Sequence, residues 1–192
     1  MHDPAYRTLV ALAAALTVAW GAWAVYDGFL REVPPGTYSY HAGNRAFEDG
    51  DYERALREYE AALRADPGNI HALRGRARAL LQLGRHAEAL AAFDEAIRRD
   101  PSTGATYANR GILLDRMGRH REALADYERA LELDPRLAEG PDWLTRFLRN
   151  QAERPPTIAD RARYLREQLA LPEERRLLRV PELDAGQRPY TL

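Results

Sequence analysis

The hydrophobic pattern divides the chain into one long apolar run and a series of short amphipathic stretches. Residues Leu9–Tyr26 carry no charge, and only one threonine and one glycine interrupt their apolar character. Extended to Leu30, the run is long enough to cross a bilayer as a helix, which needs about 20 apolar residues. Amphipathic aromatic residues, which favour the headgroup level, cluster near its end: Trp20, Trp23 and Tyr26. The pattern predicts a transmembrane anchor within residues 1–31.

Two other interpretations of this segment stay open. In a cleaved signal peptide, Arg7 would be the basic region, Leu9–Ala19 the apolar core and residues 22–24 (AWA) the cleavage site. We favour an anchor because the apolar run continues beyond a typical signal core and bulky tryptophans crowd the cleavage site. The third interpretation, a buried helix of a soluble protein, fits poorly with the linker that follows.

The flanks of the apolar run predict its orientation and its end. Arg7 and the α-amine make the N-terminal flank more positive than the opposite flank, which favours a cytoplasmic N-terminus and an exported body. Residues 32–36 (EVPPG) break any helix, since proline lacks the N–H donor and restricts the residue before it. We expect this linker to separate the anchor from the remaining body.

Beyond the linker, residues 36–137 form three units of 34 residues without a gap: 36–69, 70–103 and 104–137. The same residue types recur at the same positions of each unit. Glycines align, as do two alanines, an aromatic residue and a closing Asp-Pro pair. The aligned sets are Gly50, Gly84 and Gly118; Ala55, Ala89 and Ala123; Tyr59, Phe93 and Tyr127; and Ala62, Ala96 and Ala130. A fixed period of this length indicates stacked helical repeats.

The residue types within each unit predict two helices joined at the glycine. Glycine tolerates the left-handed conformation that ends a helix. In the second helix of the first unit, Ala55, Tyr59 and Ala62 lie on one face, because they are spaced by four and three residues. Small residues let two helices approach closely, and the aromatic ring fills the space between layers. No unit buries its apolar face alone, so neighbouring units must stack.

The arrangement resembles the tetratricopeptide repeat (TPR) family, whose pattern is W-x₂-L-G-x₂-Y followed by A-x₃-F, A and P. The second half of the pattern matches in all three units, and the resemblance as a whole covers 102 of the 192 residues. The first half departs from it at the aromatic and leucine positions and keeps the small one, as Gly43, Ala77 and Gly111. The resemblance implies an all-α fold, a right-handed superhelix of three helix-turn-helix repeats.

The last repeat needs a cover, and residues 138–179 are expected to supply capping helices. One apolar stripe at helical spacing lies within 141–151: Trp143, Leu144, Phe147 and Leu148. A second helix is predicted from Thr157, with Asp160 completing a capping box and an apolar face of Ile158, Ala162, Leu165 and Leu169. A short third helix is predicted from Pro172 to Arg179. The irregular tail at 180–192 either frays or docks against the repeats, and both interpretations stay open.

Composition and motifs give no support for catalysis or for nucleic-acid binding. The formal net charge is -1, there is no cysteine, and all 28 basic residues are arginines. The five histidines have no metal-ligand spacing, and we interpret His86 and His120 as polar turn residues. Phosphate-binding loops and catalytic motifs are missing from the sequence. We therefore expect no enzymatic activity, no cofactor, no metal and no nucleic-acid partner.

The family resemblance implies a concave groove lined by the first helix of each unit. Counting along these helices gives the candidate partner-binding residues: Tyr40, Asn44, Phe47, Arg74, Arg78, Leu81, Asn109, Ile112 and Arg116. Arginine pairs with carboxylates, and the apolar residues suit a helix or an extended peptide. The oligomeric state and the partner do not follow from the sequence.

One known type of groove is not expected here. Family members that clamp the C-terminal carboxylates of chaperones use Lys and Asn in one unit, Asn in the next, and Lys and Arg in the third. Asn44 and Asn109 echo two of these positions. At the others, Tyr40 replaces Lys, Gly75 stands at the second-unit Asn position, and Ala105 and Asn109 replace the basic pair. The pattern argues against a cytosolic cochaperone.

The sequence therefore favours a membrane-anchored scaffold or assembly factor that binds a peptide or helix of another envelope protein. The expected location is the bacterial inner membrane, with a single span at residues 9–30 and a periplasmic body. The alternative is a structural subunit of a membrane complex that contacts its partners through the anchor helix and the C-terminal helices.

Overall fold

The computed structural model describes residues 3–27, 33–140, 147, 155–179 and 190, and these contain helices and no strand. The chain falls into two compact units, Met1–Pro34 and Pro35–Leu192. The boundary lies within the predicted proline-rich linker.

The first unit contains one helix, α1 (Pro4–Val25), which has 22 residues. The Asp3 carboxylate caps its start by accepting a hydrogen bond from the Ala5 N–H at 2.9 Å. Its most apolar stretch of 18 residues has a mean hydropathy of 1.8, and none of the residues of α1 is buried within the protein. By length and composition α1 is able to cross a membrane, although a signal sequence would have the same properties.

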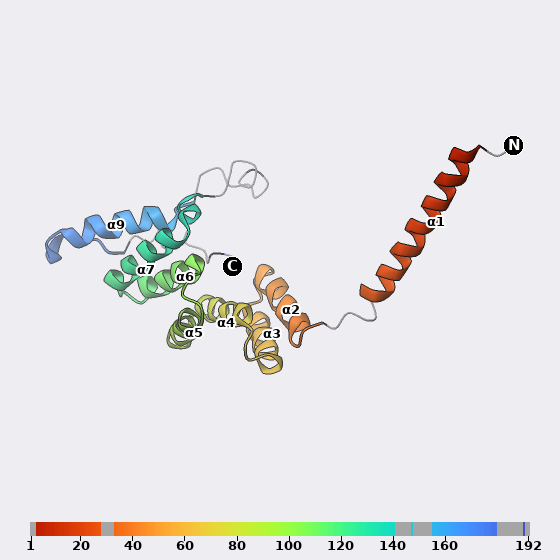
Figure 1. The fold of residues 1–192 in the computed structure, drawn as a ribbon. Helices are drawn as coiled ribbons and strands as arrows, with labels where there is room; N and C mark the ends of the chain where they lie inside the picture. Colours follow the sequence, from red (N-terminus) through yellow and green to blue (C-terminus); the bar gives the residue numbers. More distant parts are fainter. Residues whose placement is uncertain (1–2, 28–32, 141–146, 148–154, 180–189, 191–192) are drawn as a thin grey trace. The chain divides into compact units, whose positions relative to one another are not determined.

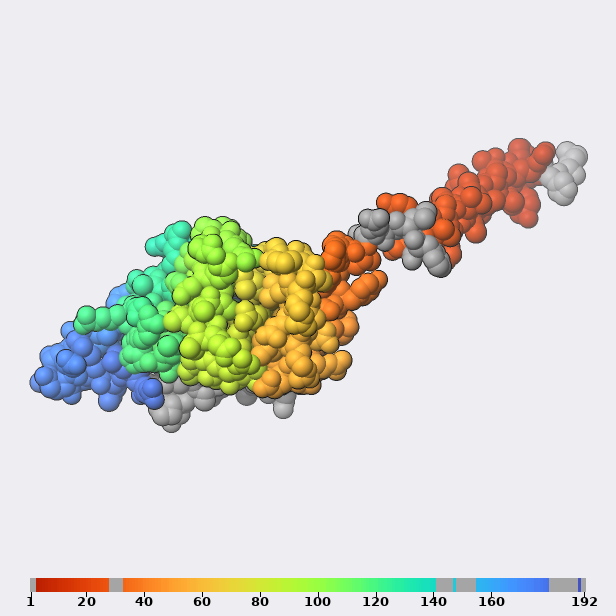
Figure 2. Space-filling model, turned by 90° about the horizontal axis from the view of Figure 1, so that it is seen from below, coloured from red at the N-terminus to blue at the C-terminus, as the bar shows by residue number. Residues whose placement is uncertain are grey.

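The second unit is built from three helix pairs stacked in succession (Figure 1). The pairs are α2 (Thr37–Glu48) with α3 (Tyr52–Ala65), α4 (Ile70–Gln82) with α5 (His86–Arg99), and α6 (Gly104–Arg116) with α7 (His120–Leu133). The second helix of each pair packs against the first helix of the next. In the space-filling view the residues of successive pairs lie side by side without a break (Figure 2). The predicted all-helical repeat fold is confirmed.

The turn inside each pair depends on a glycine in the left-handed conformation. Gly50, Gly84 and Gly118 have φ angles of 80°, 72° and 77°. In the first turn, the N–H of Asp51 donates to the carbonyl oxygen of Ala46 at 2.9 Å, which satisfies one of the last carbonyls of α2. Each first helix therefore ends two residues before its glycine.

The stacking of units one and two depends on the ring of Tyr59. This side chain is fully buried between Gly43 of α2 and Gly75 of α4. A Cβ atom at Gly43 would lie 2.8 Å from the ring, and one at Gly75 would lie still closer. The Tyr59 hydroxyl donates to Asn44 Oδ1 at 2.8 Å. Burial raises the pKa of the Tyr59 phenol to about 12, so it remains a neutral donor at physiological pH.

A further helix, α9 (Ile158–Ala170), covers the last repeat by packing on α7. It begins with the expected capping box, in which the Thr157 N–H donates to Asp160 Oδ2 at 3.0 Å and the Asp160 N–H to Thr157 Oγ1 at 3.3 Å. Of its expected apolar face, Leu169 is half-buried and the others are buried: Ile158, Ala162 and Leu165. A short 3₁₀ helix, η2 (Pro135–Ala138), precedes α9 and contributes Leu137 to the core.

The C-terminal part differs from the sequence prediction in one segment, and another segment is only partly described. Of the apolar stripe in 141–151, Trp143, Leu144 and Leu148 lie outside the described residues, and the Phe147 side chain is 75% exposed. The helix predicted from Pro172 to Arg179 is wrong, since only a 3₁₀ turn, η3 (Glu173–Arg175), forms there.

Side chains of α9 explain why no longer helix forms after Pro172. They make hydrogen bonds with the main-chain N–H and carbonyl groups that follow η3. Gln168 Oε1 accepts a hydrogen bond from the Leu177 N–H at 2.8 Å, and the Tyr164 hydroxyl donates to the Leu177 carbonyl at 2.6 Å. Arg161 donates to the Leu178 carbonyl at 3.0 Å. These bonds hold the segment along α9 and replace the bonds of a helix.

The close contact at Gly75 gives a stability prediction. Gly75→Ala should lower the free energy of unfolding by about 1–3 kcal/mol, because the new methyl group overlaps the Tyr59 ring. In a Tyr59→Leu background the same change should be neutral or stabilising, since alanine favours a helix over glycine by about 1 kcal/mol. Urea denaturation of the four proteins of this cycle measures the effect. If Gly75→Ala stabilised the protein in the native background, the close packing of Gly75 against the Tyr59 ring would be wrong.

Candidate functional site

The first helices of the three pairs place the candidate groove residues in two different environments. On α2, Tyr40, Asn44 and Phe47 are half-buried. The Tyr40 ring lies 6.2 Å from that of His71 on α4, and the Arg78 guanidinium lies 4.8 Å from the centre of the Phe47 ring. These contacts join units one and two, and the second is a cation–π interaction.

Three other candidates take part in the fold. Leu81 and Ile112 are 0% and 1% exposed and belong to the hydrophobic core. Arg74 is also buried, and it donates to the carboxylate of Asp100 and, at 2.9 Å, to Thr103 Oγ1. Hydrogen bonds, above all from Ser102 and then from Arg74, hold the pKa of Asp100 well below its usual value. The last candidate, Arg116, is half-buried near the end of α6.

The structure brings Asn109 and Arg78 together around Tyr190 from the C-terminal part of the chain. Asn109 is fully buried and makes two hydrogen bonds with the main chain of Tyr190. Its Nδ2 donates to the Tyr190 carbonyl at 3.1 Å, and its Oδ1 accepts from the Tyr190 N–H at 2.7 Å. Arg78 Nη1 makes a longer contact of 3.5 Å with the same carbonyl. Residues of α4 and α6 therefore hold the main chain of one residue, Tyr190.

The Tyr190 side chain connects this site to the cap of the repeats. Its hydroxyl accepts a hydrogen bond from the Ile158 N–H at 3.1 Å, at the start of α9, and donates to the Leu137 carbonyl at 3.4 Å. Tyr190 is half-buried and packs against the core. At this residue the structure favours docking of the tail over fraying.

A second polar cluster fixes α9 to the last repeat. Asp115 on α6 accepts hydrogen bonds from Arg161 Nε at 2.6 Å and from the Tyr127 hydroxyl at 3.3 Å. His120 Nδ1 lies 2.8 Å from the other carboxylate oxygen. His120 follows the turn directly, as expected, but it is buried, with 8% exposed, and belongs to this cluster. The repeat alignment could not show this, because the partners lie on three different helices.

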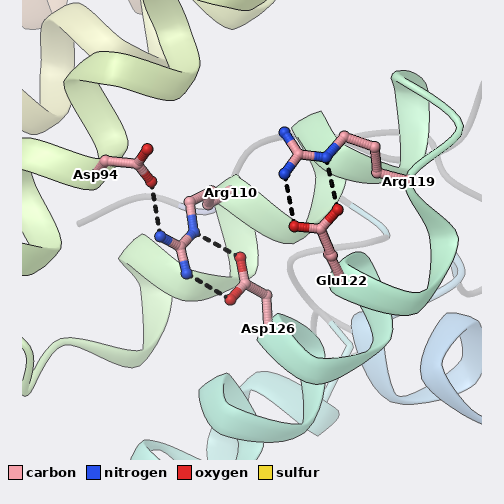
Figure 3. A network of polar contacts seen from close by, with 5 residues as sticks. All are labelled: Asp94, Arg110, Arg119, Glu122 and Asp126. Atoms are coloured by element: carbon pink, nitrogen blue, oxygen red, sulfur yellow. Dashed lines mark hydrogen bonds and ion pairs between the residues drawn. The ribbon is translucent and has the colours of Figure 1, made fainter.

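A hollow of about 370 Å³ lies between α5, α6 and α7. At its wall Arg110 donates to Asp126 at 2.7 and 2.8 Å and to Asp94 at 2.7 Å, while Arg119 pairs with Glu122 (Figure 3). Hydrogen bonds with Asp126 raise the pKa of Arg110, whereas burial raises the pKa of Asp126 despite this partner. The five charged groups form hydrogen bonds and ion pairs with one another. This pairing favours a structural role between the second and third repeats over a ligand site.

Within the described residues, no group of three or more His, Asp or Glu side chains is placed to hold a metal ion. The chemistry available at the face of α2, α4 and α6 is that of amide, guanidinium and aromatic groups. Such groups bind peptide main chain and carboxylates.

Comparison with known sequences agrees with this geometry. Two models described as tetratricopeptide repeat match residues 40–102 and 104–137, about half of the chain together. The chain belongs to the tetratricopeptide repeat family. A comparison with curated proteins gives no match.

Solved TPR structures are similar to the chain at 26–30% identity. The first TPR domain of Spaghetti (RPAP3), bound to the HSP90 peptide SRMEEVD, is 26% identical with a TM-score of 0.56, over 71% of this chain and 94% of that one. The first TPR domain of human RPAP3 is 30% identical with a TM-score of 0.50, over 61% and 89%. The TPR domain of Arabidopsis OM64 is 27% identical with a TM-score of 0.51, over 53% and 84%.

Proposed function

We propose that the protein is a non-enzymatic interaction scaffold or assembly factor whose TPR groove binds a peptide or helix of a partner protein. One observation carries the proposal: Asn109 and Arg78 contact the main chain of Tyr190. This contact supports a groove that binds a peptide through its N–H and carbonyl groups. The half-buried Tyr40 and Phe47 offer apolar surface beside this polar site.

A similar TPR domain, that of Spaghetti (RPAP3), has a bound acidic peptide, which supports a peptide ligand for this groove. The chain nevertheless departs from the carboxylate-clamp pattern, with Tyr40 and Gly75 at two of its positions. Arg74 also offers no free cation, since it pairs with Asp100 inside the fold. We therefore propose a partner other than a chaperone C-terminus.

We further propose that α1 anchors the protein in the bacterial inner membrane, with the repeats in the periplasm. Support comes from the exposure of its apolar side chains, among them Leu16, Trp20 and Trp23 at 63%, 68% and 60%. Apolar surface of this extent is costly in water and suits a lipid environment. The charge of the N-terminal flank favours the stated orientation.

The alternative, a structural subunit that uses α1 and the C-terminal helices, also has an observation in its favour. Large apolar side chains are exposed in the C-terminal part: Phe147 at 75% and Leu177 at 68%. In this alternative the groove would contribute little to partner binding.

Co-purification tests the groove. The tagged full-length chain is recovered from solubilised membranes as wild type, Arg78→Gln and Asn109→Ala, with Arg98→Gln on α5 as a control whose side chain is 72% exposed. Proteins that bind the groove should decrease about tenfold or more with the first two variants, as expected for loss of about 1.4 kcal/mol or more at an interface. The control should leave them unchanged.

Circular dichroism melting establishes that each variant is folded. Equal recovery of every partner by all four proteins would exclude the groove as the binding site and favour the alternative.

The state of α1 gives a separate prediction. The protein purified from its native membranes should retain residues 9–30 and stay with the membranes in an alkaline carbonate wash, because an apolar helix of this length partitions into lipid. N-terminal sequencing and immunoblotting measure these outcomes. A mature protein that starts after Ala24 and appears in the soluble fraction would show that the segment is a signal peptide.

A further inference from the structure

Tyr190 occupies the groove in the manner of a bound peptide. Asn109 exchanges both a donated and an accepted hydrogen bond with one residue of main chain, as in the pairing of two strands. These bonds do not depend on the type of side chain. An extended peptide from a partner would therefore compete for the same two atoms of Asn109.

The contacts of Tyr190 differ in quality. The bonds to Asn109 measure 2.7 and 3.1 Å, whereas that to Arg78 measures 3.5 Å. Arg78 is 7% exposed, and its Nε atom has no hydrogen-bond partner in the part of the chain that the structure describes. A buried guanidinium that is incompletely paired favours a stronger acceptor. A partner peptide that presents a carboxylate or carbonyl closer to Arg78 would gain a stronger hydrogen bond than the one Tyr190 makes.

We propose that Tyr190 is an internal ligand of the groove, which a partner peptide displaces in order to bind. This proposal rests on the proposed function of the groove and adds its regulation. An internal ligand multiplies the apparent affinity for every competitor by the fraction of molecules in which the groove is free. It therefore restricts binding to partners with sufficient affinity.

Displacement of Tyr190 from the groove would also affect α9, the helix that caps the repeats. The Tyr190 hydroxyl accepts from the Ile158 N–H, one of the N–H groups at the start of α9 that lack a partner within the helix. A partner that replaces only the main-chain contacts leaves this N–H to water. Occupation of the groove is thus coupled to the first turn of α9.

A binding experiment with the full-length chain in detergent tests the proposal. The probe is a fluorescein-labelled synthetic peptide with the sequence of residues 180–192, and its affinity is measured by fluorescence anisotropy. Tyr190→Pro removes the N–H that donates to Asn109 and also removes the phenol. The tail should therefore leave the groove. This variant should bind the probe at least about tenfold more tightly than the wild type, in which about nine tenths or more of the grooves would be occupied.

Two further variants locate the effect. Tyr190→Phe keeps both main-chain groups and should bind the probe more weakly than Tyr190→Pro. Asn109→Ala, added to Tyr190→Pro, should abolish the gain in affinity. A probe with proline in place of its tyrosine should not bind, and circular dichroism establishes that each variant is folded.

Equal affinity of the wild type and Tyr190→Pro for the probe would overturn the proposal. That result would not affect the proposed function, which depends on the recovery of partners by Arg78→Gln. Conversely, normal recovery of every partner by both Arg78→Gln and Asn109→Ala would reject the proposed function whatever the probe shows.

Discussion

The close approach of an aromatic ring to the backbones of two first helices is the contact on which the repeat structure depends. Tyr59 fits between Gly43 and Gly75 because neither residue has a side chain. In the last unit, a Cβ atom at Gly111 would lie 2.6 Å from Tyr127. Such contacts set the distance between α2 and α4 and between α6 and α7, and interiors packed this closely tolerate little change in volume.

The position of the proposed groove residues is a consequence of this spacing. With α2 and α4 held together by Tyr59, Arg78 lies over the Phe47 ring at 4.8 Å. On α6, Asn109 is placed so that its amide group and Arg78 contact the same carbonyl of Tyr190. Also on α6, Asp115 accepts from Arg161 and so fixes α9, the helix whose Ile158 N–H donates to the Tyr190 hydroxyl. Tyr190 therefore contacts both the face of α4 and α6 and the start of the capping helix.

Local and periodic features of the sequence predicted the fold well. The aligned glycines correctly predicted the turns, and the capping box of Thr157 and Asp160 correctly predicted the start of α9. Each of these features depends on residues close in sequence. The groove was harder to predict. Counting along a helix gives the direction of Leu81 and Ile112 but not how deeply neighbouring helices bury them. The repeat pattern also gave no indication that Arg74 pairs with a carboxylate 26 residues away.

The interactions that sequence reasoning missed are long-range pairs of polar side chains. Arg161 and Asp115 lie 46 residues apart, and Asn109 and Tyr190 lie 81 apart. No periodicity relates the members of such pairs. In the C-terminal part, Pro172 favours a helix start, but hydrogen bonds with side chains of α9 hold the chain in another conformation.

Hydrogen exchange of the full-length chain, comparing wild type with Tyr59→Ala, tests most directly whether this ring holds successive units together. In a stack where each unit contacts only its neighbours, loss of the ring should lower the protection of amides in α2, α3 and α4 and leave α7 and α9 nearly unchanged. Unchanged protection in α4, or an equal loss along all the repeats, would contradict the account.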